Sequence, residues 1–156
     1  MPKRLPALEC MAQIEEEDGR MEESRRYFER VVELKNEPVV ELLKLGELSM
    51  AARDTEAAID AFERARGLQG DQFAHFLEIG VCYLAVSRYA EAGEALDRVS
   101  PSHPGYPMAL FKRAQAAVLM KEPDWRQRVR RAAENSDEMT RQLIEQEQLF
   151  NGFTGR

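Results

Sequence analysis

Few side chains in this sequence have the types and the spacing that catalysis requires. The two cysteines, Cys10 and Cys82, and the two histidines, His75 and His103, form no CxxC, Cys/His or metal-ligand spacing. The sequence also contains no glycine-rich phosphate loop, no GxSxG and no HExxH motif. It therefore predicts a protein that is not an enzyme, with no catalytic residue, no cofactor and no metal site.

Two charged runs are the remaining candidates for binding chemistry. Residues 15–18, EEED, lack the Asp-x-Asn-x-Asp-Gly order of a calcium loop, so we interpret them as a solvated helix end. Residues 126–133, RQRVRRAA, place arginines around much of a helix, which favours a solvated capping face over a nucleic-acid patch. The formal net charge of -6 argues in the same direction, because binding of phosphates needs clustered Lys and Arg. We expect no nucleic-acid partner.

Bulk composition predicts the fold class. A chain of 156 residues with 44% hydrophobic, 32% charged and 8% aromatic residues, and with few β-branched runs, is most simply one all-α domain. No apolar run approaches the roughly 18 residues that a membrane span needs, and no cationic segment precedes an apolar one as in a signal peptide. We therefore expect a cytoplasmic protein without membrane insertion.

The elements that would position any site repeat along the chain. Leu45-Gly46 and Ile79-Gly80 are 34 residues apart, and the register extends in both directions. Within each repeat, apolar residues recur at i, i+3, i+4 and i+7, which predicts two amphipathic helices with a turn between them. The matching positions are Leu8, Met11, Ala12, Glu15, Ser24, Phe28, Val31 and Asn36, then Leu42, Leu45, Gly46, Ser49, Ala58, Phe62, Ala65 and Gly70, then Phe76, Ile79, Gly80, Tyr83, Ala92, Leu96, Val99 and Pro104.

This pattern resembles the tetratricopeptide repeat, in which W-x2-L-G-x2-Y is followed by A-x3-F and P within 34 residues. In this chain Leu or Phe stands where the family has Trp. The resemblance implies a right-handed solenoid of antiparallel helix pairs. Where the two helices of a pair cross, small residues are expected: Ala12, Gly46, Gly80 and Ala114 on the first helices, facing Ser24, Ala58 and Ala92 on the second helices.

The repeats divide the chain into predicted segments. Residues 1–134 hold the tetratricopeptide-like repeats, and residues 135–156 form a C-terminal capping helix and tail. The repeat boundaries are 5–38, 39–72, 73–106 and a degenerate 107–134. In the last repeat Arg113 replaces an aliphatic residue, as is common in terminal repeats that must meet water. Asp54 and Ser87 are expected to cap second helices, and Ser136 to cap a final helix that runs to residue 150.

A second apolar stripe lies on the first helix of the second, third and fourth repeats, beside the stripe that faces the core. A helix that is apolar nearly all round is normally buried all round. In the tetratricopeptide family the first helices line a concave groove, so by resemblance this stripe is the floor of that groove. The predicted groove residues are Leu43, Met50, Leu77, Val81, Leu84 and Phe111, which contact the partner, and Glu47 and Gln115, which set register and polarity.

Several occupants of the groove stay open from the sequence. A partner's amphipathic helix or extended apolar peptide would use the helix-in-groove mode of recognition. The C-terminal helix folded back, or a second copy of the chain, would cover the same stripe. The family's Lys/Asn/Arg clamp for a C-terminal carboxylate is not expected, because the corresponding surface carries Glu9, Gln13, Leu43, Glu47, Leu77 and Glu78. The remaining alternatives are a secretion-type chaperone that holds a hydrophobic client and a scaffold of a larger complex.

Overall fold

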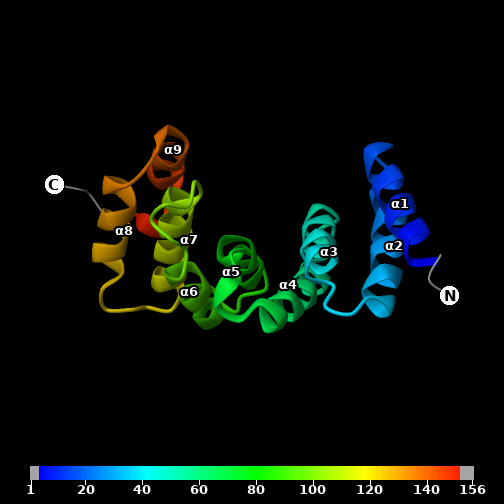
Figure 1. The fold of residues 1–156 in the computed structure, drawn as a ribbon. Coiled ribbons are helices and arrows are strands. Elements are labelled where there is room, and N and C mark those ends of the chain that lie inside the picture. The colour runs from blue at the N-terminus through cyan, green and yellow to red at the C-terminus, as the bar shows by residue number, and fades with distance from the viewer. Residues whose placement is uncertain (1–3, 152–156) are drawn as a thin grey trace. The chain divides into compact units, whose positions relative to one another are not determined.

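The computed structural model describes residues 4–151, and every regular element among them is helical (Figure 1). This confirms the all-α helical repeat fold. The helices are α1 (Arg4–Glu17), α2 (Met21–Leu34), α3 (Val39–Ala51), α4 (Thr55–Gln69), η1 (Gly70–Gln72), α5 (Phe76–Ala85), α6 (Tyr89–Asp97), α7 (Tyr106–Leu119), α8 (Trp125–Glu134), α9 (Glu138–Gln146) and η2 (Gln148–Phe150).

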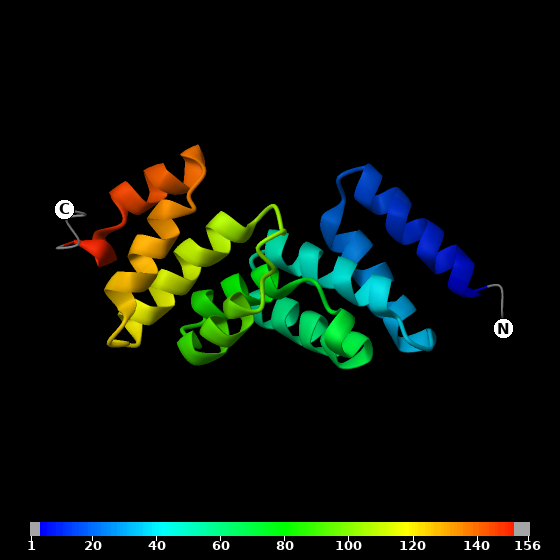
Figure 2. The ribbon, with the colours of Figure 1, turned by 60° about the vertical axis from the view of Figure 1, so that its left-hand side comes forward.

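The chain divides into two compact units, Met1–Phe73 and Ala74–Arg156, which we call unit 1 and unit 2. Unit 1 contains the helix pairs α1/α2 and α3/α4, with α2 packed on α3. Unit 2 contains the pairs α5/α6 and α7/α8, with α6 packed on α7 (Figure 2). The helices α9 and η2 also pack against α7. A repeat protein can divide into units between two successive helix pairs, because each helix pair packs only on its neighbours.

The turn inside each helix pair has the same backbone geometry four times. A positive φ occurs at Gly19, Arg53, Ser87 and Lys121, which are spaced by 34 residues. The residue after each of these donates its backbone N–H to the carbonyl five residues earlier, at 2.8 to 2.9 Å. Together with the bond from the positive-φ residue itself, this is a Schellman motif, which satisfies carbonyls at the end of the first helix. The fourth turn follows the 34-residue frame although its helices depart from the sequence pattern.

Small residues mark the helix crossings within the pairs. Ala12, Ala58, Ala92 and Ala114 are fully buried. A Cβ added at Gly46 would lie 2.7 Å from the Phe62 ring, and one added at Gly80 would lie 2.7 Å from Leu96 Cγ. The side chains closest to the glycines therefore come from one turn beyond the alanines expected to face them. The glycines leave room for those larger side chains.

Two of the three predicted N-caps are displaced by one residue. Asp54 caps α4 as expected, because its carboxylate accepts from Ala57 N at 3.3 Å. Ser87 is instead the positive-φ residue of its turn, so α6 begins after Arg88 without a side-chain cap. Asp137, not Ser136, caps α9 by accepting from Thr140 N at 2.7 Å.

The predicted final helix is shorter than expected. It ends at Gln146, Glu147 is extended, and the chain then makes the short helix η2. The expected tail from residue 152 onward lies outside the described residues. Over residues 4–151, no helix is long and apolar enough to span a bilayer. The cytoplasmic location stays a prediction.

Candidate functional site

The predicted groove residues lie on one helix of unit 1 and two helices of unit 2. They are Leu43, Glu47 and Met50 on α3, Leu77, Val81 and Leu84 on α5, and Phe111 and Gln115 on α7. The structure therefore presents two candidate faces, one in each unit, and we describe each face by itself.

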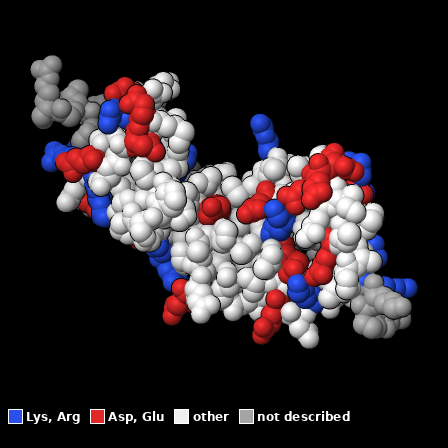
Figure 3. Space-filling model, turned by 45° about the horizontal axis from the view of Figure 1, so that its top comes forward, with Lys and Arg blue, Asp and Glu red and all other residues white. Residues whose placement is uncertain are grey.

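The α3 face of unit 1 is largely polar. Leu43 and Met50 are half-buried, whereas Glu47 is exposed and forms an ion pair with Lys44 Nζ at 3.4 Å. Lys44 also reaches Glu16 of α1 at 3.0 Å, and this bond raises the pKa of the lysine. In Figure 3 charged side chains gather over unit 1 near α1. Two apolar side chains within an ion-pair network make a poor apolar groove.

The α5 and α7 face of unit 2 has a different character. Val81, Leu84 and Gln115 line a hollow of about 290 Å³. Its other lining residues are Ala85, Tyr89, Lys112, Leu119 and Leu149. The structure thus brings three of the predicted groove residues together. Leu77 does not line the hollow and lies instead against Gly105, just before α7.

Phe111 is not on the surface of this face. Only 3% of its area is exposed, because the Phe150 ring covers it edge-on with centroids 5.9 Å apart. The two rings belong to a core cluster with Ala114 and Val129. In this structure Phe111 therefore contacts a residue of the same chain, and its expected contact with a partner stays a prediction.

The C-terminal segment covers part of this face, which is one of the alternatives that the sequence leaves open, but sequence reasoning missed the roles of Glu147 and Leu149. Gln115 donates its side-chain amide to one carboxylate oxygen of Glu147, and Leu149 N donates to the other at 3.1 Å. Lys112, on the same turn of α7, has its pKa lowered by burial and partly restored by the charge of Glu147. The run EQEQ carries no helix-breaking residue, so nothing in the sequence indicates a break at Glu147.

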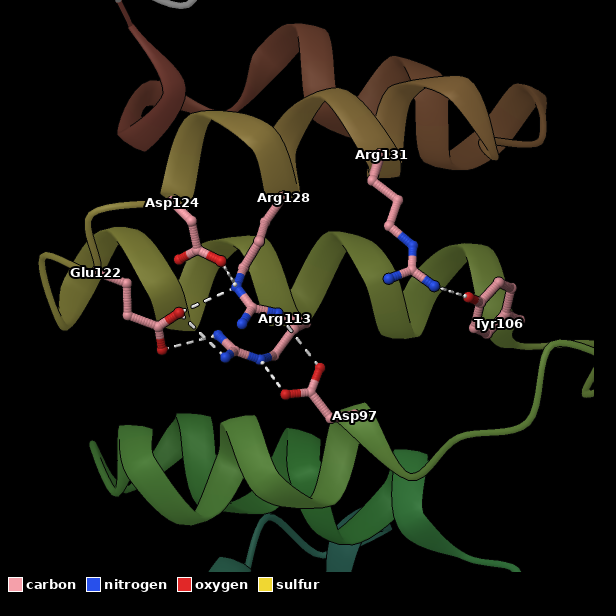
Figure 4. Close-up of polar contacts among 7 residues, drawn as sticks. All are labelled: Asp97, Tyr106, Arg113, Glu122, Asp124, Arg128 and Arg131. Atoms are coloured by element: carbon pink, nitrogen blue, oxygen red, sulfur yellow. Dashed lines mark hydrogen bonds and ion pairs between the residues drawn. The ribbon is translucent and has the colours of Figure 1, made fainter.

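A second polar cluster joins α6, α7 and α8 (Figure 4). Arg113 is buried, and its guanidinium contacts Asp97 and Glu122 at 3.0 Å each. Arg128 reaches Glu122 at 3.0 Å and Asp124 at 3.1 Å. Each arginine of this cluster is balanced by carboxylates, so the cluster ties three helices together.

The two cysteines lie in different surroundings, one buried and one exposed. Burial, with a smaller contribution from Glu78, raises the pKa of the Cys82 thiol to about 11, which disfavours the reactive thiolate. Cys10 is exposed and unpaired. Within residues 4–151, no three side chains of His, Cys, Asp or Glu are placed to hold a metal ion. The predicted lack of catalysis and of cofactors stays a prediction.

Comparison with known proteins gives a family. Two models described as tetratricopeptide repeat match residues 43–107 and 11–38, which is more than half of the chain. No curated protein shows a significant match.

Solved structures agree with the fold. A MamA RS-1 ArsTM double mutant is 16% identical with a TM-score of 0.74, covering 90% of this chain and 80% of its own. Another MamA crystal structure is 18% identical with a TM-score of 0.69, and the match covers 94% of this chain and 83% of the MamA chain. A putative kinesin light chain of Podosopora anserina with TPR-like repeats is 17% identical with a TM-score of 0.65, and the match covers 92% of this chain and 82% of the kinesin light chain. At this identity the likeness shows the fold alone.

Proposed function

Because the chain belongs to the tetratricopeptide repeat family, we propose that it is a non-catalytic interaction module that binds an apolar peptide or amphipathic helix of a partner protein. Repeat folds of this kind typically serve protein–protein interaction, because stacked helix pairs create extended surfaces for a partner. The proposed site is the α5 and α7 face of unit 2.

One observation carries this proposal. Val81, Leu84 and Leu119 surround a hollow of about 290 Å³ next to Gln115 and Lys112. The lining thus mixes apolar side chains with polar ones, and in recognition pockets apolar area supplies affinity while polar groups fix orientation. The α3 face of unit 1 lacks this composition. Its Glu47 is exposed, its Lys44 is half-buried, and the two side chains form an ion pair.

The test compares capture by variant chains. A Val81→Glu/Leu84→Glu variant places two charges on the hollow, and a Met139→Glu variant places a charge on an exposed residue of α9. Circular dichroism establishes that each variant is folded. We expect affinity purification from the source cells to recover a partner with the wild type and with Met139→Glu but not with the double variant. The purified partner should then bind the wild type and Met139→Glu with similar affinity and the double variant more weakly.

Two results would contradict the proposal. Recovery of the same proteins with all three chains would mean that the hollow is not the binding site. Recovery of the chain alone, in a dimer that the double variant abolishes, would mean that the face joins two copies instead of binding a client or another partner.

A further inference from the structure

The C-terminal segment already occupies part of the proposed site. Phe150 covers Phe111 edge-on, Glu147 accepts from Gln115, and Leu149 lines the hollow beside Val81 and Leu84. Three side chains from four consecutive residues thus use the aromatic, polar and apolar parts of the face. A segment that fits these parts at once indicates the chemistry that the face recognises.

The fit has a defined order along the chain. A carboxylate comes first, where the Gln115 amide donates and the Lys112 ammonium is near enough to be affected by its charge. An aliphatic side chain follows two residues later, and an aromatic ring one residue after that. The aromatic ring gains an edge-to-face contact in addition to its burial.

The segment can leave without unfolding the helix before it. Thr140 of α9 is fully buried, and Leu143 and Ile144 pack on the core cluster, so α9 has its own anchors. The backbone becomes extended at Glu147, and η2 is a single short turn. Leu149 is 37% exposed, which leaves Phe150 as the only deeply buried side chain of the segment.

We propose that this face binds a partner segment of the same chemistry, an acidic residue followed at the second and third positions by an aliphatic and an aromatic residue. The chain's own Glu147, Leu149 and Phe150 occupy the face until the partner segment displaces them. This inference rests on the proposed function, because it names the partner chemistry for the same face. A tethered occupant reduces the apparent affinity for a free ligand by the fraction of time that the site is closed.

The experiment supplies the segment in trans. The single tryptophan, Trp125, packs against the cluster that contains Phe150, so its emission reports whether an aromatic ring fills the site. In a Phe150→Ala chain the emission should shift to the red. The synthetic peptide EQEQLFN, which has the sequence of residues 145–151, should reverse the shift, and EQEQLAN should not.

Affinities give the second readout. We expect EQEQLFN to bind the Phe150→Ala chain at least about tenfold more tightly than the wild type, whose own segment competes. Adding Gln115→Ala to Phe150→Ala should weaken peptide binding, whereas adding Met139→Ala, on the exposed side of α9, should not. A wild-type chain carrying Glu147→Gln, which keeps the shape of the side chain, should bind more peptide than the unmodified wild type if Phe150→Ala does not fold.

Three results would contradict this inference, each in a different part. No reversal of the shift, or equal reversal by EQEQLAN, rules out recognition of this chemistry. A concentration-dependent dimer whose Trp125 emission changes with dilution, and which Phe150→Ala abolishes, means that the occupant is the segment of a second copy. If peptide binding fails while partner capture still depends on Val81 and Leu84, this inference falls and the proposed function stands.

Discussion

At the scale of single residues, the four repeated turns store backbone strain in three places. Gly19 adopts its positive φ freely, whereas Arg53, Ser87 and Lys121 adopt φ values of 61°, 62° and 56° with a Cβ present. For residues with a side chain this region costs about 1–2 kcal/mol relative to the right-handed region. The cost is tolerated because the Schellman bonds close each helix pair.

Replacing one of these residues with glycine should therefore stabilise the protein. We expect Lys121→Gly to raise the free energy of unfolding by up to about 1 kcal/mol, because relief of strain exceeds the extra chain entropy of glycine in the unfolded state. Lys121→Ala removes the same side chain but keeps the Cβ, so it should bring no gain. Urea unfolding of the wild type and the two variants measures these free energies. Equal free energies of unfolding for Lys121→Gly and Lys121→Ala would mean that the backbone at Lys121 is not strained.

Asp54 gives a prediction on pH. Its carboxylate accepts from Arg25 Nη1 at 2.8 Å and from Ala57 N, and these bonds hold its pKa below the ordinary 3.8. A lowered folded-state pKa stabilises the fold above the unfolded-state value and loses that contribution as the pH falls through the folded-state value. Asp54→Asn keeps an oxygen for the cap but loses the charge.

The wild type should be more stable than Asp54→Asn at pH 7, by on the order of half a kcal/mol because the pair is largely solvated. The difference should shrink below pH 4 and vanish at still lower pH. Chemical unfolding at a series of pH values measures it. A difference that stays constant across the series would mean that the charge of Asp54 plays no part.

At the scale of elements, the helix crossings decide whether a glycine is useful. Gly80 has the Leu96 side chain 2.7 Å from where its Cβ would be, whereas Gly67 in α4 has no atom within 4 Å. Both lie inside helices, where alanine is favoured over glycine by about 1 kcal/mol. The same substitution should therefore have opposite effects at the two sites.

We expect Gly67→Ala to raise the melting temperature and Gly80→Ala to lower it, because overpacking of a core typically costs about 1–3 kcal/mol, more than the gain in helix propensity. Thermal unfolding of the two single variants measures both. If Gly80→Ala stabilises as much as Gly67→Ala, the pair α5/α6 is not held by a close crossing.

The elements that could be predicted from the sequence are those fixed by local patterns. The 34-residue spacing places the helix pairs and their turns, because amphipathic periodicity and a turn suffice for each pair. The local pattern favours Ser87 as a cap because serine is a common cap residue, but the Schellman turn that ends α5 places it in the left-handed region. The break at Glu147 and the burial of Phe111 depend on contacts between distant segments, which no local pattern encodes.

Arg113 shows the same limit for the candidate site. Its place in the frame belongs to an aliphatic residue, and the structure fills it with a guanidinium held by Asp97 and Glu122. The sequence indicates only that this repeat departs from the pattern. The departure is compatible with a folded α7 because carboxylates from the preceding and following segments balance the buried charge.

At the scale of the whole molecule, charge separates the two units. Residues 1–73 carry 11 basic and 17 acidic side chains, whereas residues 74–156 carry 11 of each. The net charge of -6 therefore belongs to unit 1. A partner held by unit 1 would have to be basic, and its attraction would be screened by salt. A partner held by the α5 and α7 face of unit 2 would be bound mainly by apolar contact.

The salt dependence of partner binding should therefore identify the unit that binds. Raising the salt concentration shortens the Debye length from about 10 Å at 0.1 M to about 3 Å at 1 M, which weakens exposed ion pairs but leaves apolar burial intact. We expect the Kd for the captured partner, measured by calorimetry, to change by less than about threefold over this range, because Lys112 is the only charged residue that lines the hollow in the described part of unit 2 and the nearby Glu147 carboxylate offsets its charge. A steep loss of affinity with salt would instead assign recognition to the acidic surface of unit 1, and Val81→Glu/Leu84→Glu would then leave the affinity unchanged.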